Sequence, residues 1–108
     1  MFQRVVKCAG VTFRDAQNNI RSFGCKDIGS YALVREPDNP YDPNAIRVAL
    51  AGIVFLGYVP KEIAKELAPL MDQGKNFMAF FVSRNEHPHH GTLGLTVRIE
   101  EYPCQKAA

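Results

Sequence analysis

The sequence lacks the features that would place the chain in a membrane or in an oxidising compartment. No apolar run approaches the roughly 18 residues that a membrane span needs, and residues 1–7 contain no apolar stretch typical of a signal peptide. The three cysteines, Cys8, Cys25 and Cys104, are widely spaced and form no CxxC pair. This pattern favours reduced thiols over a disulfide scaffold. We therefore expect a cytoplasmic protein with no membrane partner.

Motifs of the common catalytic and metal sites are also missing. There is no GxSxG nucleophile, no HExxH zinc motif and no P-loop. His87, His89 and His90 lie close together, but no cysteine or carboxylate pattern completes a tetrahedral site around them. Residues 38–49 only partly match a calcium loop, since proline stands at the third ligand position and Ala49 at the twelfth. The sequence thus predicts no enzyme, no cofactor and no metal site.

The chain has no large excess of charge of either sign. It contains 13 Lys and Arg and 11 Asp and Glu, for a net charge of +2. This balance permits a local basic track for nucleic acid but does not require one. The 46% hydrophobic and 22% charged fractions are ordinary for a globular protein. We find no repeat, low-complexity tract or linker, so the 108 residues are expected to form a single domain over residues 1–108.

Short runs rich in β-branched and aromatic residues predict about seven strands. They cover residues 4–13, 20–23, 30–36, 45–50, 53–59, 77–83 and 93–99. Gly10 suggests a bulge or bend in the first of them, and Ala51-Gly52 suits a short hairpin turn. Residues 15–19 are polar and turn-like, and residues 84–91 read as a loop.

One principal helix is predicted over residues 61–71, with Pro60 at its first position and Gly74 as its stop. Its apolar residues recur at helical spacing on one face. They are Ile63, Ala64, Leu67, Ala68 and Met71. Pro69 is expected to kink or break the helix. Because strands and helices do not alternate, the fold class is mainly β with one principal helix (β+α), in a small antiparallel β-barrel.

A proline-rich connection at residues 36–45 is the most restricted stretch of the chain. Pro37, Pro40 and Pro43 each fix φ near −65° and push the preceding residue out of the α region, so the segment is extended and stiff. Side chains that can bond nearby backbone N–H groups fasten its turns. They are Asp38, Asn39, Asp42 and Asn44. Tyr41 is therefore expected to stand on a rigid loop, a plausible binding surface.

The string EPDNPYDPNAI at residues 36–46, followed by LGYVPKE at residues 56–62 and the helix, resembles the HIRAN domain. This module occurs at the N-terminus of some SNF2-type DNA-repair helicases and as free-standing bacterial and phage proteins. The resemblance covers nearly the whole chain. It implies an OB-like or SH3-like β-barrel with a helix, and a pocket for the 3′-hydroxyl end of single-stranded DNA.

Site residues follow from the resemblance by position. Tyr41 matches a tyrosine that packs against the terminal nucleotide, and Asp42 matches an aspartate that accepts from the 3′-hydroxyl. Phe13 stands where the helicase member has a tyrosine, and Tyr58 where it has a histidine. Thr12 replaces an arginine that contacts a phosphate, which is the most serious departure.

Physical chemistry agrees with such a site. Aromatic side chains stack on bases of any identity, and a fixed carboxylate accepts from a hydroxyl while repelling a phosphate at the same place. A substitute for the missing cation would come from one of the neighbouring basic residues. The candidates are Arg14, Arg35, Lys61 and Arg84.

Two other functions stay open at this point. The barrel and its loop could dock another protein, such as a helicase or other repair or phage protein, without DNA affinity of their own. A small Mg-dependent nuclease would instead need Glu36, Asp38 and Asp42 to converge on a metal. Phosphate binding weakens steeply with added salt, so salt dependence separates DNA binding from protein docking.

Overall fold

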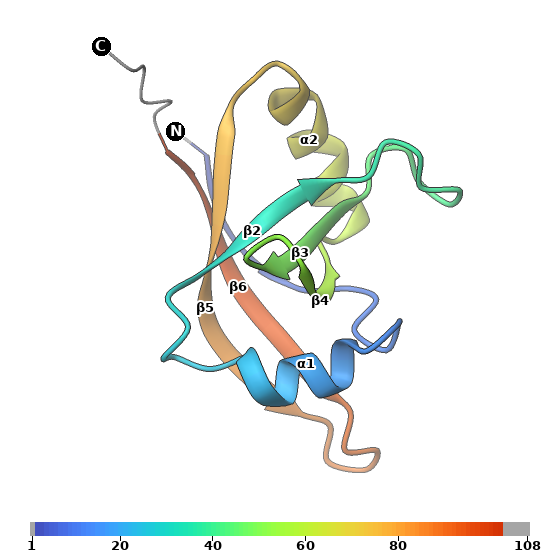
Figure 1. Cartoon of the computed structure of the whole chain (residues 1–108), viewed down its shortest axis with the longest axis vertical. Helices are drawn as coiled ribbons and strands as arrows, with labels where there is room; N and C mark the ends of the chain where they lie inside the picture. Colours follow the sequence, from blue (N-terminus) through green and yellow to red (C-terminus); the bar gives the residue numbers. More distant parts are fainter. Residues whose placement is uncertain (1, 103–108) are drawn as a thin grey trace.

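The computed structural model describes residues 2–102, which form one curled six-stranded sheet and two helices (Figure 1). The elements are β1 (Gln3–Lys7), α1 (Ala16–Phe23), β2 (Ser30–Arg35), β3 (Ile46–Leu50), β4 (Val54–Tyr58), α2 (Lys61–Asp72), β5 (Asn76–Glu86) and β6 (Leu93–Tyr102). Neighbouring strands are antiparallel in the order β1-β6-β5-β2-β3-β4. The predicted fold class, mainly β and barrel-like, is confirmed. Cys104 lies outside the described residues.

The two ends of the sheet meet just past β1, so the sheet curls into a half-barrel. Ala9 pairs with Tyr58 at the end of β4, and each N–H donates to the other's carbonyl at 2.8 Å. Gly57 makes this approach possible, because a Cβ there would lie 2.9 Å from the Ala9 carbonyl oxygen. The segment that follows, residues 10–15, is therefore fixed beside the end of β4.

Apolar side chains from every strand fill the concave side of the sheet. Along β6, the residues at alternate positions are buried, as expected for a strand with one face on the core. These are Leu93, Leu95, Val97 and Ile99. Helix α2 adds Ala64, Leu67 and Ala68 to the same cluster, and α1 adds Ile20. Tyr31 on β2 is buried, and its hydroxyl donates to the Phe23 carbonyl at 2.8 Å.

Helix α1 occupies residues that the sequence pattern assigned to a turn and a strand. The predicted strand at residues 20–23 is wrong, as is the predicted turn at 15–19, and residues 11–13 form a turn, not the end of the first strand. The helix buries Ala16 and Ile20, four residues apart on one face. Its polar side chains hold it to the sheet. Gln17 bonds both the N–H and the carbonyl of Leu93, and Asn19 donates to the Phe55 carbonyl at 2.8 Å.

Most other boundaries agree with prediction, and the strand count falls from seven to six. Pro60 precedes α2 as its N-cap residue, and α2 continues through Pro69 to Asp72 without the predicted break. Strand β5 extends to Glu86, which shortens the predicted loop at residues 84–91. Ala51 and Gly52 have φ values of 55° and 75°, as a tight hairpin turn requires. Among residues 2–102, no helix is long and apolar enough to cross a membrane.

Candidate nucleic-acid interface

The loop between β2 and β3 projects from the sheet beside α2 (Figure 1). Its base is closed by the Glu36 N–H, which donates to the Ala45 carbonyl at 2.9 Å. Arg35 also donates to this carbonyl, at 3.0 Å, and it donates to both carboxylate oxygens of Asp72, at 2.9 and 3.1 Å. This bidentate pair holds the pKa of Asp72 below its usual value. The Arg35 guanidinium therefore ties the loop to the end of α2.

Side-chain hydrogen bonds fix the outer part of the loop, as predicted for Asn39 and Asp42. The Asn39 side-chain oxygen accepts the N–H groups of Tyr41 and Asp42 at 2.8 and 3.1 Å, and Asp42 Oδ1 accepts the Asn44 N–H at 2.9 Å. The Tyr41 side chain makes few contacts with the rest of the described structure, since Tyr41 is 92% exposed. A constrained backbone thus presents an aromatic ring to solvent.

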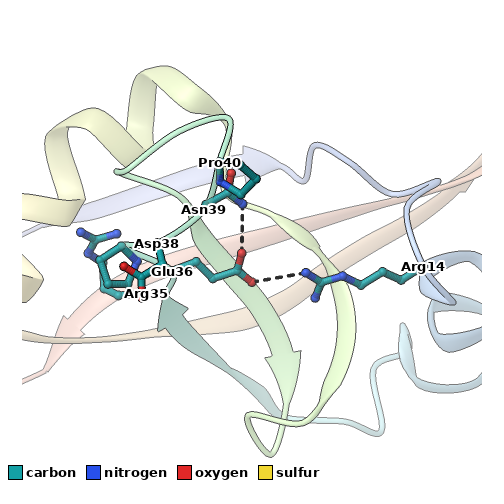
Figure 2. Close-up of a pocket in the computed structure, with 7 residues that line it drawn as sticks. Arg14, Arg35, Glu36, Asp38, Asn39 and Pro40 are labelled. Carbon is teal, nitrogen blue, oxygen red and sulfur yellow. Dashed lines mark hydrogen bonds and ion pairs between the residues drawn. The ribbon is translucent and has the colours of Figure 1, made fainter.

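An open cavity of about 380 Å³ lies at the foot of this loop. It is lined by Arg14, Arg35, Glu36, Pro37, Asp38, Asn39 and Pro40. Figure 2 shows that the loop supplies one side of the cavity and that Arg14 reaches toward Glu36 from the other side. The cavity therefore separates the β2–β3 loop from the segment at residues 10–15.

The Glu36 carboxylate is the hydrogen-bonding centre of the cavity. Its Oε1 accepts from the Tyr58 hydroxyl at 2.9 Å and from Asn39 Nδ2 at 3.0 Å. Its Oε2 accepts from Arg47 Nη1 at 2.8 Å, with Arg14 Nη2 at 3.9 Å. Burial of the carboxyl, 13% exposed, acts to raise its pKa, but these donors outweigh burial and hold the pKa of Glu36 below its usual value. Glu36 is therefore charged at neutral pH.

Arg14 lines the side of the cavity opposite the loop and contacts two aromatic residues behind it. The Arg14 guanidinium lies over the Phe55 ring at 4.8 Å and donates to the Tyr58 hydroxyl at 3.3 Å. Burial, followed by the hydrogen bond to Glu36, raises the pKa of Tyr58, which keeps the phenol protonated. Phe13 is 58% exposed, so its ring is open to a ligand.

Of the eight predicted site residues, Arg14 and Arg35 line the cavity, and Tyr58 is bonded to Glu36 and Arg14 beside it. Tyr41 and Asp42 lie on the β2–β3 loop. Phe13 is next to Arg14 in the chain. Thr12 is exposed on the same segment. Lys61 is exposed at the start of α2, and no hydrogen bond or ion pair within residues 2–102 connects it with the cavity. Arg84 lies elsewhere, because it donates to the Arg21 carbonyl at 2.9 Å at the end of α1.

Sequence reasoning missed Arg47, and it gave Glu36 and Asn39 no part in the binding site. Arg47 was detectable in principle, because it is a charged residue between the apolar Ile46 and Val48 and therefore points away from the core of a predicted strand. The role of Glu36 had no local signal, since its partners lie up to 22 positions away.

The histidine-rich turn is closed on itself. The Nδ1 atom of His87 accepts the N–H groups of His89 and His90 at 3.2 and 3.3 Å, and the rings of His87 and His90 stack at 4.5 Å. Over the described range, no group of three or more His, Cys, Asp or Glu residues is placed to hold a metal ion.

Comparison with known proteins identifies relatives of the chain. It matches the HIRAN domain over residues 4–101. It is 51% identical over 47 residues to a Fanconi-associated nuclease 1 homolog of Oryza sativa subsp. japonica, covering 41% of this chain and 5% of that protein. It is 54% identical over 41 residues to the helicase-like transcription factor of Oryctolagus cuniculus, covering 38% and 4%. The chain thus spans about one twentieth of the length of these relatives.

Two solved structures share the fold. A protein from Lactobacillus plantarum superimposes with a TM-score of 0.69 at 23% identity, covering 94% of this chain and 100% of that one. The HIRAN domain of human HLTF superimposes with a TM-score of 0.58 at 22% identity, covering 89% and 74%. Since the family match extends over nearly all of the described residues, the chain belongs to the HIRAN domain family.

Proposed function

We propose that the chain binds single-stranded DNA and recognises its free 3′-hydroxyl end on the surface formed by the β2–β3 loop and residues 10–15. The observation that carries the proposal is Tyr41, an aromatic ring that is 92% exposed on a backbone fixed by Asn39, next to a cavity with an arginine. The names of the relatives, a Fanconi-associated nuclease and a helicase-like transcription factor, support a function on DNA.

Each part of the surface has a task in this proposal. Tyr41 and Phe13 stack on bases, which contributes about 1 to 3 kcal/mol per base without regard to sequence. Arg14 binds a phosphate, two positions after Thr12, and it is 54% exposed. Tyr58 offers its ring only, because its hydroxyl is engaged by Glu36 and Arg14. Arg35 fastens the loop, and Lys61, exposed at the start of α2, is a further candidate for a phosphate contact.

Asp42 is the group that distinguishes a strand end. Its Oδ1 is held by the Asn44 N–H at 2.9 Å, so the carboxylate has a fixed direction and keeps acceptor sites for a hydroxyl. A terminal hydroxyl donates to this carboxylate, whereas a terminal phosphate meets like charge. Preference for a free 3′-hydroxyl over a 3′-phosphate follows from this geometry.

Fluorescence anisotropy tests the proposal with three labelled oligonucleotides of one sequence: a free 3′-hydroxyl, a 3′-phosphate and a duplex end. We expect tightest binding to the free hydroxyl, with the preference over phosphate reduced by Asp42→Asn. Asp27→Asn, an exposed carboxylate in the α1–β2 connection, is the matched control and should keep the preference. Equal affinity of the wild type for the hydroxyl and phosphate ends would refute end recognition.

One observation favours a second candidate, a protein-interaction module. Glu36 pairs with Arg47 and lies near Arg14, so much of the positive charge around the cavity is neutralised. An exposed tyrosine in such surroundings also suits a protein partner. A salt titration separates the two functions, since binding to DNA weakens steeply as salt is added. A Mg-dependent nuclease is not supported, because Glu36 is taken up by its arginine and tyrosine partners.

A further inference from the structure

The Glu36 side chain connects the two parts of the proposed binding surface. Toward the loop, it accepts from Asn39, whose side-chain oxygen in turn holds the N–H groups of Tyr41 and Asp42. Toward the barrel, it accepts from the Tyr58 hydroxyl at 2.9 Å. A continuous series of hydrogen bonds therefore links the Tyr41 backbone on the β2–β3 loop, through Asn39 and the Glu36 carboxylate, to Tyr58 on β4.

The same carboxylate also limits the free positive charge of the site. Arg47 donates to it at 2.8 Å and Arg14 lies 3.9 Å away, so two guanidinium groups share one negative charge. The Arg47 side chain is 25% exposed and that of Arg14 is 54% exposed, so both are within reach of solvent. Without the carboxylate, both cations would attract phosphates anywhere along a strand.

We propose that Glu36 is a positioning residue that sets the end preference of this surface, by fixing the loop relative to the barrel and by restraining Arg14 and Arg47. The inference rests on the proposed function, because end preference has meaning only if DNA ends bind there. Glu36 itself touches no DNA: its oxygens are already occupied by protein donors. Its effect is transmitted through Asn39 and the two arginines.

Glu36→Gln tests the restraint on the arginines. The glutamine keeps the side-chain shape and one oxygen acceptor for Tyr58 or Asn39, but its NH₂ group replaces the oxygen that accepts from Arg47. Two donors then face each other, and the guanidinium groups are released. We expect stronger binding to any single strand, a salt slope steeper by about 0.7 for each added phosphate contact, and a smaller ratio of affinities for hydroxyl and phosphate ends.

Asn39→Asp tests the connection to the loop separately. The aspartate keeps the oxygen that accepts the N–H groups of Tyr41 and Asp42, but it removes the donor to Glu36 and brings two carboxylates together. The outer part of the loop is then released from Glu36, while the base of the loop stays closed and Arg47 stays paired. We expect the end preference to fall with an unchanged salt slope, which a general loss of folding would not produce.

Backbone ¹⁵N order parameters of Tyr41 and Asp42 provide a readout that does not depend on DNA. In the wild type these amides should be rigid, near about 0.85, and in Asn39→Asp they should fall toward about 0.6. Glu66→Gln, which removes an exposed carboxylate paired with Arg4 at 3.2 Å, is the control and should change neither the order parameters nor the binding.

The outcomes separate the inference from the proposed function. If the wild type does not distinguish the two ends, the proposed function fails, and the order parameters alone decide whether Glu36 positions the loop. If the wild type prefers the hydroxyl end but Glu36→Gln and Asn39→Asp keep the full preference, the inference is overturned. Rigid Tyr41 and Asp42 amides in folded Asn39→Asp would also overturn it.

Discussion

Replacing Tyr41 by alanine should separate binding from folding more cleanly than any other change in this chain. The ring is 92% exposed, so its loss removes almost no packing, and we expect the free energy of unfolding to change by no more than about 0.5 kcal/mol. The backbone N–H of residue 41 remains and still donates to Asn39 at 2.8 Å, so the direction of Asp42 is preserved.

The expected loss of binding follows from one stacked base. At about 1 to 3 kcal/mol per base, Tyr41→Ala should raise the Kd for a 3′-hydroxyl oligonucleotide by roughly 5- to 150-fold. No hydrogen bond to the Tyr41 hydroxyl exists within residues 2–102, so Tyr41→Phe keeps the stacking face and should bind within about twofold of the wild type.

Two measurements on the same samples check this prediction: anisotropy titrations for the Kd and urea unfolding for stability. If Tyr41→Ala bound as tightly as the wild type, the exposed ring would have no part in DNA recognition. If instead it lost more than about 1 kcal/mol of stability, the ring would pack in solution, against the premise of its exposure.

Three further predictions concern the core and the cavity. Tyr31→Phe removes the donor to the part-buried Phe23 carbonyl at the end of α1, so the free energy of unfolding, measured with urea, should fall by about 0.5 to 1.5 kcal/mol; an unchanged value would mean that water replaces the hydroxyl. Burial raises the pKa of the Cys8 thiol to about 12, so this thiol should react slowly at pH 8. In a folded Cys104→Ser variant, maleimide at pH 8 should label the half-buried Cys25 first, and mass spectrometry should show Cys8 unmodified. Because the pKa of Glu36 is lowered in the folded state, its charged form stabilises the fold above pH 4.5, and this stabilisation is lost as the pH falls through the lowered pKa. A plot of unfolding free energy against pH should therefore be flatter on its acid side for Glu36→Gln, and parallel curves for both proteins would contradict this.

The part of the fold that the sequence predicted correctly is the part with local signals. Residues 30–74 contain fixed proline φ values, a glycine turn and a helical apolar period, and each of these acts over a few positions. Helix α1 was missed because it buries only Ala16 and Ile20 and is held by polar side chains. The partners of Gln17 lie up to 76 positions away, a distance at which sequence pattern gives no information.

The candidate site divides in the same way. The exposed position of Tyr41 and the fastening of Asp42 followed from prolines and Asx residues in the loop itself. The function of Arg35 did not, because its partner Asp72 lies 37 positions away at the end of α2. The Glu36 cluster depends on the register of β3 and β4, which places Arg47 opposite Tyr58. The hairpin turn alone would place Arg47 opposite Gly57, and a register shift between Val48 and Ala49, which the sequence pattern did not predict, moves it to Tyr58.

The pairing of Ala9 with Tyr58 joins the two ends of the curled sheet and also positions part of the proposed binding surface. Because Phe13 and Arg14 follow this pairing by only a few residues, the contact that joins the two ends of the curled sheet also fixes where this ring and this cation lie. A side chain at Gly57 would place its Cβ 2.9 Å from the Ala9 carbonyl oxygen and 3.2 Å from Cys8 Cβ, so it would push this pairing apart and displace the segment that carries Arg14. A substitution at this one glycine would therefore disturb both the fold and the proposed binding surface.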